Sequence, residues 1–150
     1  MSIKINLEFV LKRYHPDVEG LPELREVFRI QCRIRFKTVE GYGEPEKAIV
    51  DTGAPISLIP FDMWRHAEIE YLGEDYLRGV VPKEECYLPA DIGRIKAVLT
   101  DKDENTSDEL TFLAYLPFTS KVPLIIGIME LMEKGVVWLD LRNRNGYIEL

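Results

Sequence analysis

Apolar and polar side chains alternate along much of the chain, with the two-residue period of a β-strand that buries one face. The clearest run covers residues 27–36, where arginine and glutamine occupy the polar positions. A similar alternation begins near the N-terminus, at residues 3–9. Further strands are predicted over 47–51, 92–100, 109–116, 136–141 and 146–150. These patterns predict an all-β fold.

Two short helices interrupt the predicted strands. The first covers residues 61–67 and follows Pro60, and the second covers residues 128–134, where the apolar positions have helical spacing. Gly135 stands where a glycine commonly caps the C-terminus of a helix. Residues 101–108 are rich in charge and are predicted to form a solvated hairpin tip.

Length and charge narrow the class of protein. The chain has 150 residues, a length that one domain with its own core accommodates. Its formal net charge of −7 disfavours a nucleic-acid partner, which would require a basic face. No apolar run approaches the roughly 20 residues that span a bilayer. The first eight residues lack the pattern of a secretory signal, so we expect a cytoplasmic protein without a membrane partner.

The cysteines and histidines do not predict a metal site or a cysteine nucleophile. Cys32 and Cys86 are too few for a disulfide framework or a zinc site, and we expect both to be ordinary buried thiols. Neither His15 nor His66 has the spacing of a metal ligand. The sequence therefore predicts neither a metal nor an organic cofactor.

The strongest chemical signal is the segment that follows the strand at 47–51. An apolar run delivers Asp51 to the start of a turn, where the strand partly removes its carboxylate from water. Gly53 allows a sharp turn and lets its own amide approach that carboxylate, which a side chain would obstruct. Thr52 and Ser57 offer hydroxyls that can hold the loop by hydrogen bonds. The bland alternative is that Asp51 is only a turn residue.

The segment Ile49–Ser57 resembles the active-site loop of the retropepsin-like aspartic proteases, with Ala54 following the Asp-Thr-Gly tripeptide. A second match lies about 75 residues further on, where Leu124–Gly127 is similar to the hydrophobic-hydrophobic-Gly element of that family. The resemblance implies that Ile126 and Gly127 pass beside the catalytic loop. It also implies a closed β-barrel lobe over residues 25–150, with residues 1–24 as an N-terminal extension whose role the sequence does not define.

The family mechanism requires two carboxylates that share one proton. Asp91-Ile92-Gly93 is the nearest internal imitation of the first loop, and we reject it because isoleucine replaces the hydroxyl residue. The resemblance therefore implies a homodimer in which Asp51 of each copy contributes to one site, and a peptide or protein as substrate. The dyad itself activates the water, so no cofactor is needed.

Two further family elements are assigned by position. Residues 77–86 are the candidate flap over the cleft, with Gly79, Val80 and Val81 at its centre, although Pro82 lacks an N–H. The C-terminal residues 146–150 suit a strand that interleaves with the termini of a partner.

Two alternatives to an active homodimer remain open. Because the candidate flap departs from the family pattern, the chain could instead be a catalytically silent module that dimerises or binds peptides. A monomer that becomes active only with a different subunit is the third possibility.

Overall fold

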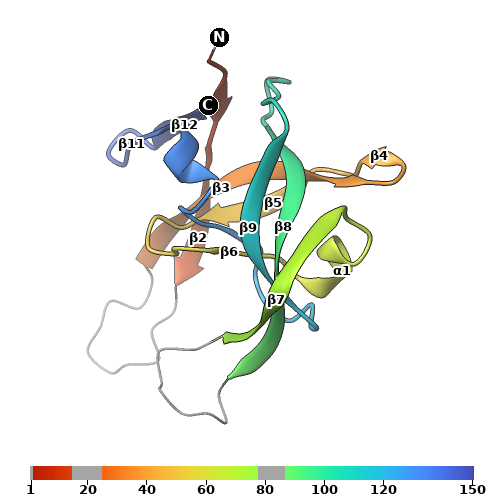
Figure 1. Cartoon of the computed structure of the whole chain (residues 1–150). Helices are drawn as coiled ribbons and strands as arrows, with labels where there is room; N and C mark the ends of the chain where they lie inside the picture. Colours follow the sequence, from red (N-terminus) through yellow and green to blue (C-terminus); the bar gives the residue numbers. More distant parts are fainter. Residues whose placement is uncertain (1, 15–24, 78–86) are drawn as a thin grey trace, which may run out of the picture.

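The computed structural model describes residues 2–14, 25–77 and 87–150, and these residues form β-strands with two very short helices (Figure 1). The elements are β1 (Lys4–Asn6), β2 (Glu8–Tyr14), β3 (Arg25–Thr38), β4 (Gly41–Tyr42), β5 (Glu46–Val50), β6 (Ser57–Leu58), α1 (Phe61–Trp64), β7 (Ile69–Leu77), β8 (Leu88–Thr100), β9 (Leu110–Pro117), β10 (Ile125–Ile126), the 3-10 helix η2 (Met132–Lys134), β11 (Val136–Asp140) and β12 (Asn145–Glu149). The predicted all-β class is confirmed.

Six strands close into a barrel. Their order is β3-β5-β10-β6-β9-β8, and β8 pairs back onto β3 to complete the circle. β2 and β7 lengthen the sheet beyond the barrel, and the short β4 pairs with β3. Because β3 and β8 are the two longest strands, each can pair with more than one neighbour along its length.

The core follows the alternation seen in the sequence. Every second side chain is buried along the second half of β3 and along most of β9, with Cys32, Ile34 and Phe36 of β3 and Phe112, Ala114 and Leu116 of β9. Burial raises the pKa of the Cys32 thiol to about 12, so this cysteine remains protonated at neutral pH, as expected of a buried packing residue. Cys86 and His15 lie outside the described residues, and His66 is exposed.

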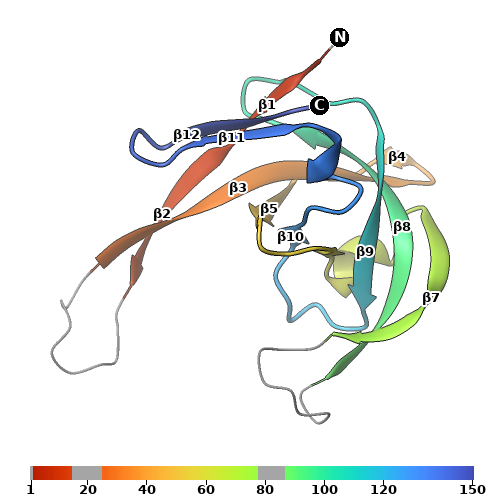
Figure 2. The same cartoon turned by 60° about the vertical axis from the view of Figure 1, so that its left-hand side comes forward.

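A second, three-stranded sheet joins the two ends of the chain. Its order is β1-β12-β11, and Ile5 and Ile148 face each other in its buried side. Figure 2 shows β1 leading directly into β2, which crosses to the large sheet. Residues 4–14, which belong to the predicted extension at 1–24, therefore pack into the same sheets as the rest of the chain.

The loop at 101–108 joins the antiparallel strands β8 and β9 and is mostly exposed, as predicted for a solvated hairpin tip, but its residues Asp101 and Ser107 are buried. Asp101 is only 7% exposed, and its carboxylate accepts hydrogen bonds from the amides of Asn6, Asp103 and Asn105 and from the Asn105 side chain, at 2.9–3.0 Å. Asp101 thus orders its own loop and ties it to the junction of β1 and β2.

We expect Asp101→Ala to lower the free energy of unfolding by about 2 kcal/mol, because the mutation leaves several backbone donors without an acceptor. Urea denaturation at pH 7 measures this loss. Asp108→Ala serves as the control, since Asp108 is an exposed acid of the same loop. Equal effects from the two mutations would contradict the structural role of Asp101.

The same carboxylate predicts a dependence of stability on pH. Burial raises the pKa of Asp101, but the hydrogen bonds from Asn6, Asn105 and Asp103 outweigh burial and lower the pKa below its usual value. The stabilisation is therefore complete above the pKa of the unfolded chain, about 4, and declines as the pH falls through the lower pKa of the folded state. The difference in stability between wild type and Asp101→Asn should shrink between pH 6 and pH 2.

The helices are shorter than the sequence predicts. The helix expected at 61–67 is the single turn α1, and the one expected at 128–134 consists of turns and the 3-10 helix η2. Gly135 is the C-terminal cap of η2, as expected: its amide donates to the Met132 carbonyl at 3.3 Å, and its backbone is extended, with φ of −150°. In the described part of the chain, no helix is long and apolar enough to cross a membrane.

Candidate functional site

The Asp51 loop joins two barrel strands that are not direct neighbours, because a third strand is paired between them. The loop connects β5 to β6, and β10 lies between them, parallel to β5 and antiparallel to β6. Ile126 pairs with Val50, and the Asp51 amide donates to the Ile126 carbonyl at 3.1 Å. A segment about 75 residues away thus fixes the point at which Asp51 leaves its strand.

Gly127 packs against the back of this loop. Its amide donates to the hydroxyl of Ser57 at 2.9 Å, and the Ser57 side chain is fully buried. The next amide, that of Ile128, donates to the carbonyl of Ala54 at 3.0 Å. A Cβ atom on Gly127 would lie 2.7 Å from that same carbonyl oxygen, so the contact requires glycine. Ser57 therefore holds the crossing segment and does not contact the Asp51 carboxylate as a direct partner.

The Asp51 carboxylate is half-buried and is oriented by its own loop. The amide of Gly53 donates to Asp51 Oδ1 at 2.9 Å, and the amide of Ala54 donates to the Asp51 carbonyl at 3.1 Å. A Cβ atom on Gly53 would lie only 3.2 Å from Oδ1, a close approach that agrees with the glycine expected there. Thr52 and Gly53 are exposed. The loop therefore holds one oxygen of Asp51 by an amide at the surface of the molecule.

The other predicted positions fall in different surroundings. Asp91 lies within β8, opposite Glu74 of β7 and Leu116 of β9, so its carboxylate belongs to a strand and not to a loop. The candidate flap residues Gly79, Val80 and Val81 lie outside the described residues. The strands on either side of them, β7 and β8, are paired up to Leu77 and Leu88.

The C-terminal strand cannot interleave with a partner in the way the sequence interpretation proposed. β12 pairs with β1 on one side and with β11 on the other, so both of its hydrogen-bonding edges are occupied by its own chain. The prediction for residues 146–150 was wrong because β1 takes the place that a partner strand would need. Among the described residues, β1 and β11 form the outer edges of this sheet.

A hollow at the β7–β8 hairpin was not identified from the sequence. It has a volume of about 400 Å³ and combines acidic and aromatic side chains from β7, β8 and the residue after β9. The signal was missed because residues 69–77 are exposed at most positions, which removes the alternation by which a strand is recognised.

Within the described residues, no group of three or more His, Cys, Asp or Glu side chains could hold a metal ion. Comparison with known proteins adds no relative, because no family model matches the chain and no curated protein matches it. The function must therefore be argued from the Asp51 loop itself.

Proposed function

We propose that this protein is an aspartic endopeptidase of the retropepsin type that acts as a homodimer, with one Asp51 from each copy. The observation that carries the proposal is the hydrogen-bonded crossing of the two segments that resemble this family. Ile126 and Gly127 anchor both ends of the loop that holds Asp51. A simple turn residue would not need a loop that is clamped at both ends by a distant glycine-containing segment.

The proposed chemistry follows from two carboxylates with one proton between them. The ionised carboxylate takes a proton from a water molecule, whose oxygen attacks the carbon of the scissile amide. The protonated carboxyl gives its proton to the carbonyl oxygen. The tetrahedral intermediate then collapses, the C–N bond breaks, and a proton passes to the leaving amine. The Gly53 amide would keep one Asp51 oxygen oriented through these steps, because it already donates to that oxygen.

The open edge of β11 is our candidate contact between the two copies. Val136 and Trp138 of β11 are 57% and 41% exposed, although both are large apolar residues. The Trp138 ring stacks on the ring of Tyr147 in β12, with 5.4 Å between their centres. The Lys4 ammonium lies over the same Tyr147 ring, 4.6 Å from its centre. An unpaired strand with exposed apolar side chains invites addition of another strand. Antiparallel pairing of β11 with its copy would extend the small sheet across a two-fold axis.

We expect Trp138→Lys to raise the dissociation constant of the dimer at least about tenfold, because it places a charge in the contact. Sedimentation equilibrium over a range of concentrations measures this constant. The control is Val39→Lys, which adds the same charge to a side chain that is 93% exposed in the β3–β4 turn. A wild-type chain that remains monomeric at high concentration would contradict the homodimer.

The peptidase activity is tested with a mixture of peptides of diverse sequence, incubated between pH 3 and pH 8 at concentrations where the protein is dimeric. Mass spectrometry should find new internal termini that differ from the intact peptides by the addition of one water. Absence of cleavage over the whole range, from a protein shown to be dimeric, would reject the peptidase and favour the silent module. The cytoplasmic location stays a prediction.

A further inference from the structure

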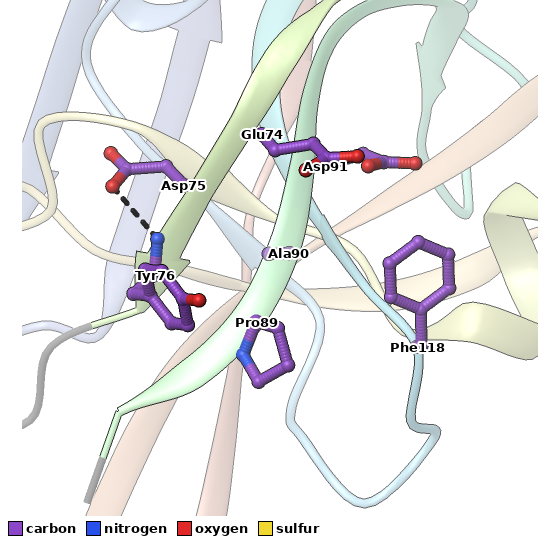
Figure 3. Close-up of a pocket in the computed structure, with 7 residues that line it drawn as sticks. All are labelled: Glu74, Asp75, Tyr76, Pro89, Ala90, Asp91 and Phe118. Carbon is purple, nitrogen blue, oxygen red and sulfur yellow. Dashed lines mark hydrogen bonds between the residues drawn. The ribbon is translucent and has the colours of Figure 1, made fainter. Parts of the chain in front are cut away.

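We infer that the hollow at the β7–β8 hairpin binds a cationic side chain, arginine or lysine, of a polypeptide partner. Glu74, Tyr76, Pro89, Asp91 and Phe118 supply its walls (Figure 3). Its volume of about 400 Å³ is ample for one such side chain. The inference concerns binding alone and does not depend on the proposed peptidase activity.

The aromatic wall is exposed and held in place. Phe118 is 57% exposed, yet its ring packs edge-on against Trp64 at 5.6 Å and near Phe61 at 6.5 Å. The Trp64 indole donates to the carbonyl of Pro117 at 2.8 Å, which fixes the backbone just before Phe118. A large aromatic face is thus presented to solvent on a rigid support. Such a face can take the aliphatic stem of a long basic side chain and attract its charged end.

The two carboxylates of the hollow, Glu74 and Asp91, do not stabilise the sheet in which they lie. Glu74 and Asp91 stand directly opposite each other on β7 and β8, and Figure 3 shows both side chains extending toward the side of Phe118. Like charges in this position destabilise an antiparallel pair. Within the described residues, neither of them takes part in an ion pair.

Two acids at the other end of the same hairpin lie close to basic residues. Four residues earlier, Glu70 stands opposite Arg94, which also binds Glu130 at 2.9 Å. Glu68 lies 3.8 Å from Lys96. Acidic residues therefore lie close to basic residues at this end of the hairpin. At Glu74 and Asp91, by contrast, two acids face each other beside an aromatic ring.

Together these features fit a cation better than an apolar or anionic ligand. The stem of arginine or lysine would lie along Phe118 and Pro89, and its charged end would meet both carboxylates, relieving their repulsion. Asp75 also lines the hollow, but its carboxylate already accepts from the Tyr76 amide at 2.7 Å, and Figure 3 shows it pointing away from Phe118. The negative net charge attracts any basic peptide, so the test must separate the pocket from this general effect.

The experiment is a nuclear magnetic resonance titration of the full chain with acetyl-Ala-Ala-Arg-Ala-Ala-amide. The matched probe replaces arginine with norleucine, which has a similar stem and no charge. We expect shift changes centred on β7, β8 and Phe118, and a dissociation constant at least fivefold lower for the arginine peptide. The double variant Glu74→Gln/Asp91→Asn should raise the dissociation constant of the arginine peptide at least fivefold, and Phe118→Ala should do the same.

The control is Glu44→Gln/Glu104→Gln, which removes two exposed acids elsewhere and leaves the hollow intact. If the control and the pocket variant weaken binding equally, the attraction is a net-charge effect and the inference is wrong. It is equally wrong if the shift changes centre on another face, or if the norleucine peptide binds as well. The spectra themselves report whether each variant is folded. Asp51→Asn should bind the peptide as wild type does, so failure of the peptidase proposal would leave this result unchanged.

Discussion

Replacing Asp51 with asparagine is expected to lower kcat/KM for peptide hydrolysis at least about 10³-fold, because the amide can neither take a proton from water nor donate one to the scissile carbonyl. Asparagine has the same shape as aspartate and keeps an oxygen that can accept from the Gly53 amide, as Asp51 Oδ1 does at 2.9 Å. The loop and the dimer should therefore survive the substitution. Initial rates on one cleaved peptide, measured together with sedimentation, give both results.

The control for this variant is Asp108→Asn, which removes one exposed carboxylate far along the chain. It should retain the full rate. Undiminished hydrolysis by Asp51→Asn would assign any observed activity to another site or to a contaminant, and the proposed role of Asp51 would be lost.

Gly127→Ala is expected to lower the free energy of unfolding by about 3 kcal/mol, the upper part of the usual range for overpacking. The new Cβ atom would lie 2.7 Å from the Ala54 carbonyl oxygen and 2.9 Å from the Ile56 carbonyl carbon. Both neighbours are backbone atoms, so the loop itself has to move. Because this loop carries Asp51, we expect hydrolysis to fall as well, even at temperatures where the variant is folded.

The matched control is Gly73→Ala in β7, where a Cβ atom would meet nothing within 4 Å. The free energy of unfolding of that variant should lie within about 0.5 kcal/mol of the wild-type value, as is usual for surface substitutions. Urea denaturation compares the two variants directly. If Gly127→Ala were as stable as Gly73→Ala, the close packing of the crossing segment against the Asp51 loop would be contradicted.

The parts of the fold that were predictable are those with a local cause. The alternation over 27–36 gives β3, and the apolar run before Asp51 gives β5, since both strands bury one side of the chain. The approach of the Gly53 amide to Asp51 could be predicted for the same reason, because it involves residues two positions apart. The meeting of Gly127 with Ser57 could be expected only from the family resemblance.

The parts that were missed depend on contacts between distant residues. Asp101 is buried because the amide of Asn6 comes to it from the other end of the chain, and no pattern within 101–108 encodes that. β12 pairs with β1 of the same chain, which brings the two ends of the chain together. No local pattern indicates such a distant pairing, so the sequence alone favours a partner's strand at this position. β7 lies at an edge of the sheet with most side chains exposed, so it lacks the alternation that marks the other strands.

The central claim is that Asp51 acts together with its own copy, and mixing wild-type and Asp51→Asn chains tests it most directly. Equal amounts of the two chains, dissociated and allowed to reassociate, form dimers of which about one quarter contain two aspartates. If both carboxylates are required, hydrolysis should fall to about one quarter of the wild-type rate, and at other ratios it should follow the square of the wild-type fraction. A rate of about one half, proportional to the wild-type fraction itself, would show that one Asp51 suffices and would contradict the account.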